Sequence, residues 1–211
     1  MYPKTGNVGK HIKKFKFVFW PKTLGQFALV TLVVLNPLAS YSSEENDLAL
    51  WNVLKSPRHV ALMRHAIAPG TGDPSVFKLE DCRTQRNLSE EGRDQARKIG
   101  ARFSAHGITR PRIFSSQWCR CRETAELMNL STVKDLPILN SFFQRYADRE
   151  RQTQGLVKWL ASQSLDGPLV LVTHQVNITA LTNIYPSSGE IVVIHRSNKG
   201  NISVIGSIDS N

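Results

Sequence analysis

The short segment from Ala61 to Ala66 (Ala-Leu-Met-Arg-His-Ala) joins an apolar run to two side chains that can do chemistry. Arg64 and His65 directly follow the apolar residues, as expected for polar groups that a buried strand delivers to the mouth of a site. A guanidinium group binds the oxygens of a phosphoryl or carboxylate group bidentately, and a neutral imidazole can act as a nucleophile. This pair therefore predicts an anion pocket that contains a nucleophile.

Two later segments supply the same residue types after a turn or a strand. Arg120 follows the segment Ser-Ser-Gln-Trp-Cys at 115–119, and His174 follows the apolar run Val170–Thr173. Ligands of sheets built from parallel strands bind at the carboxyl ends of the strands, so we expect all four side chains to converge there. Two arginines and two histidines would form a pocket for a dianion such as a phosphoryl group.

The elements that must position these residues alternate between strands and helices. Short apolar runs predict strands at residues 59–64, 111–114, 133–136, 169–173, 190–195 and 201–208. Helical spacing and capping signals predict helices at residues 44–56, 89–105, 120–128, 155–164 and 176–182. This alternation predicts an α/β fold, a three-layer sandwich with a mostly parallel central sheet flanked by helices. Residues 66–87, rich in Pro, Gly, Asp and Thr, are predicted to form a long functional loop.

Four segments of the chain, in this order, resemble the signature motifs of the histidine phosphatase superfamily, also called phosphoglycerate-mutase-like. They are Arg64–Ala66 for Arg-His-Gly, Leu88–Ala96 for Leu-Ser/Thr-x-x-Gly-x-x-Gln-Ala, Ser115–Ala125 for Ser-Ser-x-x-x-Arg-x-x-x-Thr-Ala, and Thr173–Gln175 for Ser/Thr-His-Gly. The resemblance covers roughly residues 58–208. It implies the three-layer fold and a phosphoric monoester hydrolase, similar to small exported bacterial members such as the lipopolysaccharide core heptose phosphate phosphatases.

The resemblance also implies roles for individual residues. His65 would be the nucleophile that becomes phosphorylated, and His174 would be a second histidine that stabilises the transition state in its protonated form. Arg64 and Arg120 would bind the phosphoryl oxygens, and the backbone N–H of Gln175 would be a further phosphate ligand. No metal or organic cofactor is implied, because the arginines would neutralise the phosphoryl charge. The segment Leu88–Ala96 would be structural.

The chain departs from the family pattern in its glycines and in its proton donor. Ala66 and Gln175 stand where the motifs have glycine, and residues 137–141 (Pro-Ile-Leu-Asn-Ser) carry no carboxylate where many members have Glu or Asp. Five carboxylates elsewhere are open candidates for the proton donor: Asp73, Glu80, Asp81, Asp148 and Glu150.

Without a general acid, which is typically worth about 10²–10⁴-fold in rate, we expect substrates with good leaving groups. The second hypothesis is a non-catalytic phospholigand-binding module that retains the anion pocket but lacks an efficient proton donor.

Several other residues of reactive types are expected to lie outside the chemistry. His59, His106 and His195 are interpreted as structural, because each stands at the start or end of a predicted element. Arg122 is expected to point away from the pocket, because residues two apart on a helix do not share a face. Trp118 is expected either to line the pocket rim or to pack in the core.

The basic charge of the chain is concentrated at its N-terminus. The formal net charge is +10, and residues 1–42 carry six lysines and no acid, which leaves +4 for the remainder. A 12-residue apolar run, Leu24–Leu35, follows the lysines, and Ser40–Ser42 offers small residues for cleavage. Residues 1–42 are therefore predicted to be an export signal or an uncleaved membrane anchor, and 43–211 one histidine phosphatase-like domain.

This leader places the domain in the periplasm or at the periplasmic face of the inner membrane. The predicted partner is a phosphorylated small molecule, a glycan or a lipid headgroup. Nucleic acid is not expected, because the mildly basic remainder has no basic run interleaved with aromatic residues.

Three cysteines, Cys82, Cys119 and Cys121, complete the set of reactive side chains. In an oxidising compartment they predict one disulfide and one free thiol. Cys119 and Cys121 are too close in sequence for an easy bridge, so Cys82 is expected to pair with either of them.

Overall fold

The computed structural model describes residues 38–210, and the apolar run at 24–35 lies outside them. The first helix, α1 (Leu38–Val53), starts earlier than the predicted helix at 44–56, so the predicted domain boundary after residue 42 falls within it. The export signal or anchor itself stays a prediction. Within residues 38–210, no helix is both long and apolar enough to cross a membrane.

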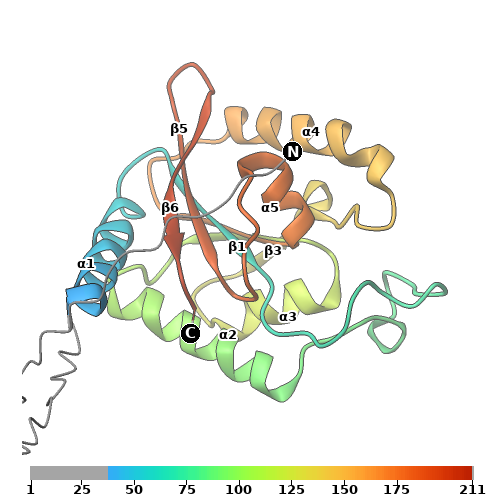
Figure 1. Cartoon of the computed structure of the whole chain (residues 1–211). Helices are drawn as coiled ribbons and strands as arrows, with labels where there is room; N and C mark the ends of the chain where they lie inside the picture. The colour runs from blue at the N-terminus through green and yellow to red at the C-terminus, as the bar shows by residue number, and fades with distance from the viewer. Residues whose placement is uncertain (1–37, 211) are drawn as a thin grey trace, which may run out of the picture. The chain divides into compact units, whose positions relative to one another are not determined.

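A six-stranded mixed sheet forms the centre of the fold (Figure 1). Its strands are β1 (His59–Arg64), β2 (Arg112–Ser115), β3 (Val133–Asp135), β4 (Leu169–Thr173), β5 (Ile191–Arg196) and β6 (Ile202–Ile208). Their order across the sheet is β3-β2-β4-β1-β5-β6, with the first four parallel and the last two antiparallel. The predicted α/β sandwich with a mostly parallel sheet is confirmed, and each predicted strand lies within about one residue of its observed bounds.

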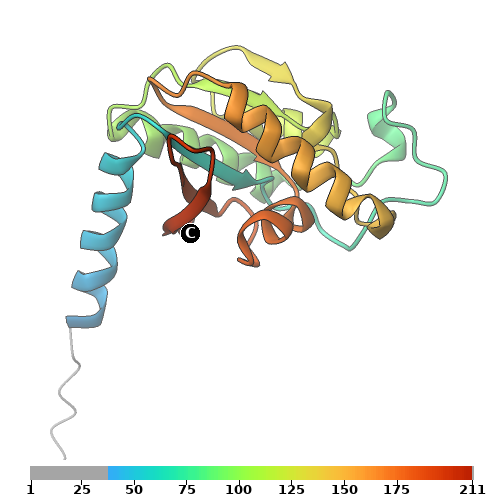
Figure 2. The ribbon, with the colours of Figure 1, turned by 90° about the horizontal axis from the view of Figure 1, so that it is seen from above.

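Helices cover both faces of this sheet, as the two views of the ribbon show (Figures 1 and 2). On one face, α1, α2 (Glu90–Ala105) and α3 (Cys119–Leu127) pack on side chains such as Met63 of β1. On the other face, α4 (Arg149–Ser162) and α5 (Gln175–Thr182) pack on Leu62 and its neighbours. Successive strand residues point to opposite faces, so a strand buried on both sides must be apolar throughout.

The segment Leu88–Ala96 fixes the start of α2 to the chain that leaves β1. Ser89 caps the helix by accepting a hydrogen bond from the backbone N–H of Gly92 at 3.1 Å. A side chain at Gly92 would meet the carbonyl oxygen of Ile67 at 2.0 Å, so only glycine allows this approach. Gln95 accepts a hydrogen bond from the N–H of Ile67 at 3.0 Å. These contacts place the segment in a structural role.

Helix α4 begins six residues earlier than the sequence pattern predicts. The predicted start at Gly155 rests on the apolar residues that follow it, but the observed first turns are mostly exposed and bury little apolar surface. Gly155 lies inside the helix, where an added Cβ would lie 2.7 Å from the Ile138 side chain. The helix therefore retains a poor helix former because Ile138 packs closely there.

Candidate active site

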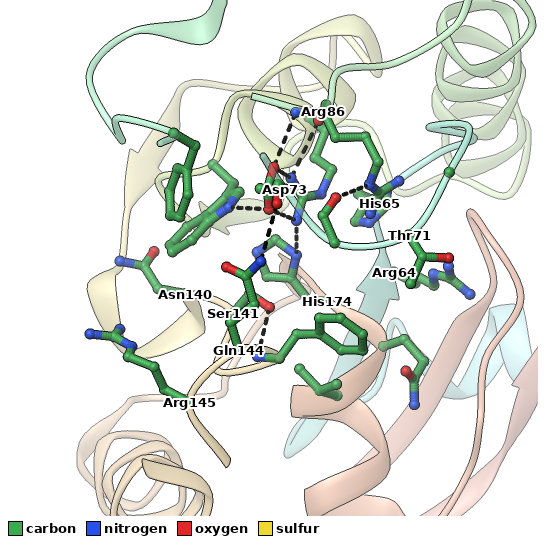
Figure 3. A pocket seen from close by; sticks show the side chains of 18 of the residues that line it. Arg64, His65, Thr71, Asp73, Arg86, Asn140, Ser141, Gln144, Arg145 and His174 are labelled. Carbon is green, nitrogen blue, oxygen red and sulfur yellow. Dashed lines mark hydrogen bonds and ion pairs between the residues drawn. The ribbon is translucent and has the colours of Figure 1, made fainter. Parts of the chain in front are cut away.

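A cavity of about 470 Å³ opens at the carboxyl ends of the parallel strands. Arg64 and His65 reach it from the end of β1, Arg120 from α3, and His174 from the junction of β4 and α5. Figure 3 shows Arg64, His65 and His174 facing one cavity, with Asp73 and Arg86 beside them. The structure thus brings together the four side chains that the sequence singled out, although they are spread over more than a hundred residues.

His65 is buried and held in one tautomer. Its Nδ1 lies 2.8 Å from the carbonyl oxygen of Ala66, and since a carbonyl only accepts, Nδ1 carries the proton. Burial, and then the charge of Arg120, lower the pKa of His65 well below its ordinary value. The imidazole is therefore neutral at neutral pH, with an unprotonated Nε2 that receives no hydrogen bond from residues 38–210.

His174 is also buried, and both of its ring nitrogens are engaged. Nδ1 lies 3.3 Å from Nη2 of Arg120, which can only donate, so the proton is on Nε2, 2.8 Å from Oγ of Ser116. Burial and the Arg120 charge lower the pKa of His174 well below its ordinary value. Burial and these charges favour a neutral ring, and the protonated form in the transition state stays a prediction. A bound dianion would raise this pKa.

Asp73, from the loop at 66–87, forms a buried ion pair with Arg120. Oδ1 and Oδ2 lie 2.8 and 3.1 Å from Nη1 and Nη2 of the guanidinium, and the two side chains are 6% and 3% exposed. Trp118 and the backbone N–H of Arg86 also donate to this carboxylate. Burial alone would raise the pKa of Asp73, but the hydrogen bonds and charge of Arg120 hold it below its ordinary value.

Arg86 is a third arginine of the cavity, and the sequence reasoning missed it. Its Nε donates to the carbonyl oxygen of Gly72 at 2.8 Å and its Nη1 donates to Ala68. Burial, and then the charge of Arg120, lower the pKa of Arg86 to about 10, so it stays charged at neutral pH. Its position two residues before the motif that begins at Leu88 was the one available signal.

Arg64 completes the set by donating from Nη1 to the carbonyl oxygen of Pro186 at 2.9 Å, and burial lowers its pKa. Within the described chain, Nη2 of Arg64 and of Arg86 has no hydrogen-bond acceptor. A fourth arginine of the cavity, Arg145, is mostly exposed and pairs with Asp148 at 3.5 Å. The three buried or half-buried arginines and the Asp73 carboxylate leave a net charge of +2, which is complementary to a phosphoryl dianion.

Only one of the five candidate proton donors reaches the cavity. Among the described residues that line it, Asp73 carries the only carboxylate. Asp81 pairs with Arg83 outside the cavity, and Glu80 and Glu150 are exposed. Asp148 pairs with Arg151 and with the lining residue Arg145, but does not itself line the cavity. Since Asp73 is held ionised and accepts hydrogen bonds from its neighbours, no protonated acid lines the cavity among the described residues.

The segment at 137–141 reaches the cavity with amide and hydroxyl groups. Asn140 and Ser141 line it, and Oδ1 of Asn140 accepts hydrogen bonds from Ser116 Oγ and from the backbone N–H of Gln117. A neutral acceptor thus stands at the place where the family pattern has a carboxylic acid.

Three further residues take positions that the sequence left open or predicted only in part. Gln175 lines the cavity, but its side chain turns back to donate to Thr179 Oγ1 at 2.8 Å. Trp118 both lines the cavity and packs in the core, with its ring centroid 5.4 Å from that of His174. Arg122 points away and donates to Asp135 at 2.7 Å, as predicted.

The other histidines lie outside the cavity. The rings of His59 and His195 face each other at 5.0 Å across β1 and β5, and His106 stacks on Trp51 at 4.7 Å. Their structural interpretation agrees with these positions.

A disulfide ties the long loop to the helix that carries Arg120. Cys82 pairs with Cys119, which selects one of the two alternatives, and Cys121 is a buried free thiol whose pKa burial raises to about 12. Gln85 reinforces this tie, because its Oε1 accepts a hydrogen bond from the backbone N–H of Cys119 at 3.0 Å. The loop that supplies Asp73 and Arg86 is thus fixed to α3 at both Cys82 and Gln85.

Removing the disulfide is expected to destabilise the fold and to weaken any activity of the site. The bridge closes a segment of 37 residues, for which the entropy of the unfolded chain predicts about 3–4 kcal/mol. Urea unfolding of wild type and of the Cys82→Ser/Cys119→Ser variant measures this difference. Adding reductant should lower the wild type to the level of the variant and leave the variant unchanged. Equal urea midpoints for the oxidised wild type and the variant would contradict a stabilising role of the disulfide.

With this geometry described, the chain can be compared with known proteins. Residues 60–142 match the sequence model of the histidine phosphatase superfamily (branch 1). A stretch of 94 residues, 42% of this chain, is 30% identical to the mitochondrial serine/threonine-protein phosphatase Pgam5 of Drosophila grimshawi. That match spans only 30% of the length of the relative.

Solved structures share the fold over most of their length. The protein histidine phosphatase SixA, in a complex with tungstate, is similar with a TM-score of 0.53 and 17% identity, over 72% of this chain and 97% of its own. A putative α-ribazole-5′-P phosphatase from Escherichia coli K-12 MG1655 is similar with a TM-score of 0.56 and 14% identity, over 74% and 98%. Residues 60–142 are thus similar in sequence to the histidine phosphatase superfamily, and the chain shares the phosphoglycerate-mutase-like fold of these structures.

Proposed function

We propose that this protein is a phosphatase that hydrolyses a phosphate ester or anhydride through a phosphohistidine intermediate on His65. One observation carries the proposal: the Ala66 carbonyl holds the proton of His65 on Nδ1, which leaves a neutral Nε2 at a cavity with three buried or half-buried arginines and an exposed fourth. A lone pair on a desolvated imidazole beside a pocket of net positive charge is the arrangement that an in-line attack on phosphorus needs.

The reaction would proceed in two displacements at phosphorus. In the first, the Nε2 lone pair of His65 forms the N–P bond while the bond from phosphorus to the leaving oxygen breaks. In the second, water attacks phosphorus, the N–P bond breaks, and inorganic phosphate leaves with His65 restored to its neutral form. The arginines stabilise the charge on the equatorial oxygens in both steps. The backbone N–H at the start of α5, at Gln175, is a further candidate for contact with these oxygens.

The site lacks a side chain that donates a proton to the leaving oxygen, and this lack limits the substrate class. Because Asp73 is held ionised and Asn140 replaces an acid, the leaving oxygen must depart largely as an anion or take its proton from water. Phosphoanhydrides, acyl phosphates and aryl phosphates tolerate this, whereas alkyl and sugar phosphates do not.

We expect kcat/KM to rise steeply as the leaving group becomes more acidic. The missing acid predicts that kcat/KM for p-nitrophenyl phosphate exceeds kcat/KM for glycerol phosphate by about 10²–10⁴-fold, apart from small differences in binding. Steady-state hydrolysis of a series of aryl and alkyl phosphates measures the slope. A flat series, with alkyl esters as fast as aryl esters, would show that a proton donor operates in the site after all.

Direct detection of the intermediate tests the covalent step. Purified protein mixed with excess p-nitrophenyl phosphate and quenched in base should carry an acid-labile phosphoramidate, visible by ³¹P NMR and located at His65 by mass spectrometry. Turnover without such a species, under conditions where product release shows a burst, would exclude the phosphohistidine route.

A second candidate function is a non-catalytic phospholigand-binding module. It is favoured by the Asp73–Arg120 pair, which occupies a predicted phosphate-binding arginine, and by the neutral Asn140. Binding of phosphate or vanadate without turnover of p-nitrophenyl phosphate, an acyl phosphate and phosphohistidine would favour this function over the phosphatase.

We also propose that the protein works in the cell envelope, exported to the periplasm or anchored at the periplasmic face of the inner membrane. The basic leader with its apolar run and the Cys82–Cys119 disulfide support this location, because disulfides persist in oxidising compartments. A glycan or lipid headgroup that carries its terminal phosphate through an anhydride bond is then the proposed substrate, because such a bond has a good leaving group. Its apolar part could contact Phe77, Phe143 and Tyr185, which line the cavity. Fractionation of cells that express the full chain, with mass spectrometry of its N-terminus, decides between cleavage, anchoring and a cytoplasmic protein.

A further inference from the structure

Arg120 uses all of its terminal N–H groups inside the protein. Nη1 contacts Asp73 Oδ1 at 2.8 Å and the carbonyl oxygen of Arg86 at 3.3 Å, and Nη2 contacts Asp73 Oδ2 at 3.1 Å and His174 Nδ1 at 3.3 Å. A guanidinium group has five N–H donors, and here the one on Nε is buried without a partner in the described chain. Arg120 therefore has no free pair of terminal donors with which to bind a phosphoryl group bidentately.

The partner of Arg120 is fixed as firmly as Arg120 itself. Asp73 also accepts hydrogen bonds from Trp118 Nε1 at 3.0 Å and from the backbone N–H of Arg86 at 3.1 Å. The Cys82–Cys119 disulfide ties the same loop to α3. The Asp73 carboxylate thus accepts four hydrogen bonds, and the loop that carries it is linked to α3 by a disulfide. We therefore expect it to remain in place when a ligand enters.

The consequence of this arrangement reaches His174. Because Arg120 donates to Nδ1, that nitrogen must be unprotonated, and the ring proton lies on Nε2, which donates to Ser116 Oγ. Ser116 Oγ in turn donates to Asn140 Oδ1 at 3.2 Å. Each group in this series donates to the next, from Arg120 to His174 and then to Ser116 and Asn140. This order specifies that Nε2 of His174 is the donor and Nδ1 the acceptor.

We propose that Asp73 is a positioning residue of the site: through Arg120 it holds His174 as the Nε2–H tautomer, and the phosphoryl oxygens are left to Arg64 and Arg86. This inference rests on the proposed phosphatase function for its kinetic consequence, but its structural part does not. Arg64 and Arg86 each keep an Nη2 group without an acceptor in the described chain, as a phosphoryl group requires. Arg86 thereby takes the binding role that the family resemblance gives to Arg120.

The tautomer of His174 is measured first, on the full chain and without substrate. Long-range ¹H–¹⁵N spectra of the histidine rings distinguish Nδ1–H from Nε2–H, and the spectrum of a His174→Gln variant identifies the signals. We expect Nε2–H in wild type and a mixture of both tautomers in Asp73→Asn, because an amide cannot accept both N–H groups of Arg120. Nδ1–H or a charged ring in wild type at neutral pH would overturn the proposal, whether or not the protein is a phosphatase.

Kinetics and anion binding supply the second measurement. For p-nitrophenyl phosphate, Asp73→Asn should lower kcat by about 10–100-fold with KM changed by less than about threefold, as for other residues that orient a histidine. Arg86→Gln should instead weaken vanadate binding and raise KM. If Asp73→Asn binds vanadate more tightly and keeps kcat, Asp73 is merely an anion that competes for Arg120, and the proposal fails.

Asp81→Asn is the matched control, because it removes the same charge from the same loop. Asp81 pairs with Arg83 at 2.9 Å on the surface and does not line the cavity. We expect its kinetics and its His174 spectrum to equal those of wild type. A thermal melt of each variant confirms folding. If Asp73→Asn does not fold, the wild-type tautomer and the Arg86→Gln binding measurement still decide the question. Complete inactivity of wild type toward every phosphate would reject the proposed function and leave the tautomer result standing.

Discussion

Replacing His65 with alanine is expected to lower turnover of p-nitrophenyl phosphate by about 10⁴-fold or more, because among the described cavity residues only His65 offers a ring nitrogen with a free lone pair. His174, the other cavity histidine, has one ring nitrogen protonated and the other hydrogen bonded to Arg120, so it offers no lone pair. Vanadate binding should change by less than about tenfold, because the arginines that neutralise a dianion remain. Initial rates and vanadate titration of the purified variant measure both quantities.

His59→Ala serves as the matched control for this loss. It removes an imidazole from the opposite end of the same strand, where the ring contacts His195 and lies away from the cavity. The control should keep wild-type kcat. Residual activity of His65→Ala above about one per cent of wild type would mean that water or another residue attacks phosphorus directly, and it would reject the covalent route.

The second large effect is expected on stability, from Arg120→Met. This change removes the one cation paired with Asp73 in the described chain while leaving the carboxylate almost fully buried. An uncompensated buried charge typically costs about 3–5 kcal/mol, so the free energy of unfolding measured by urea should fall by that amount. The double variant Arg120→Met/Asp73→Asn should recover a large part of the loss, because it no longer buries a lone charge.

Arg122→Met provides the comparison, two residues further along the same helix. Its partner is Asp135, and both side chains are more than a third exposed, so solvent screens the pair. The expected loss is less than about 1 kcal/mol. If Arg120→Met were no more damaging than Arg122→Met, or if the double variant were less stable than the single, the buried pair would not contribute as described.

The amino-acid sequence by itself determined the strands and the residues at their ends. The runs at 59–64 and 169–173 are apolar over most of their length, as a strand buried on both faces requires, and the polar residues that end or follow them mark the carboxyl edge of the sheet. Parallel strands bring such edges together, so the places of Arg64, His65 and His174 in the chain were enough to group them. Capping by Ser89 was equally local, and it was confirmed.

The tertiary structure alone decided which charges meet inside the cavity. Asp73 and Arg86 lie in a loop without periodicity, and the contact between Asp73 and Arg120 spans 47 residues, a separation over which spacing carries no information. The same holds for the choice of Cys119 over Cys121 as the partner of Cys82.

The protonation of the site was likewise beyond the sequence. A histidine pKa depends on burial and on the charges around the ring, which exist only after packing, so the sequence could not show that both lower the pKa of His174. The sequence named the chemical groups, and long-range contacts decided which of them are free to bind a phosphoryl group and which are occupied by one another.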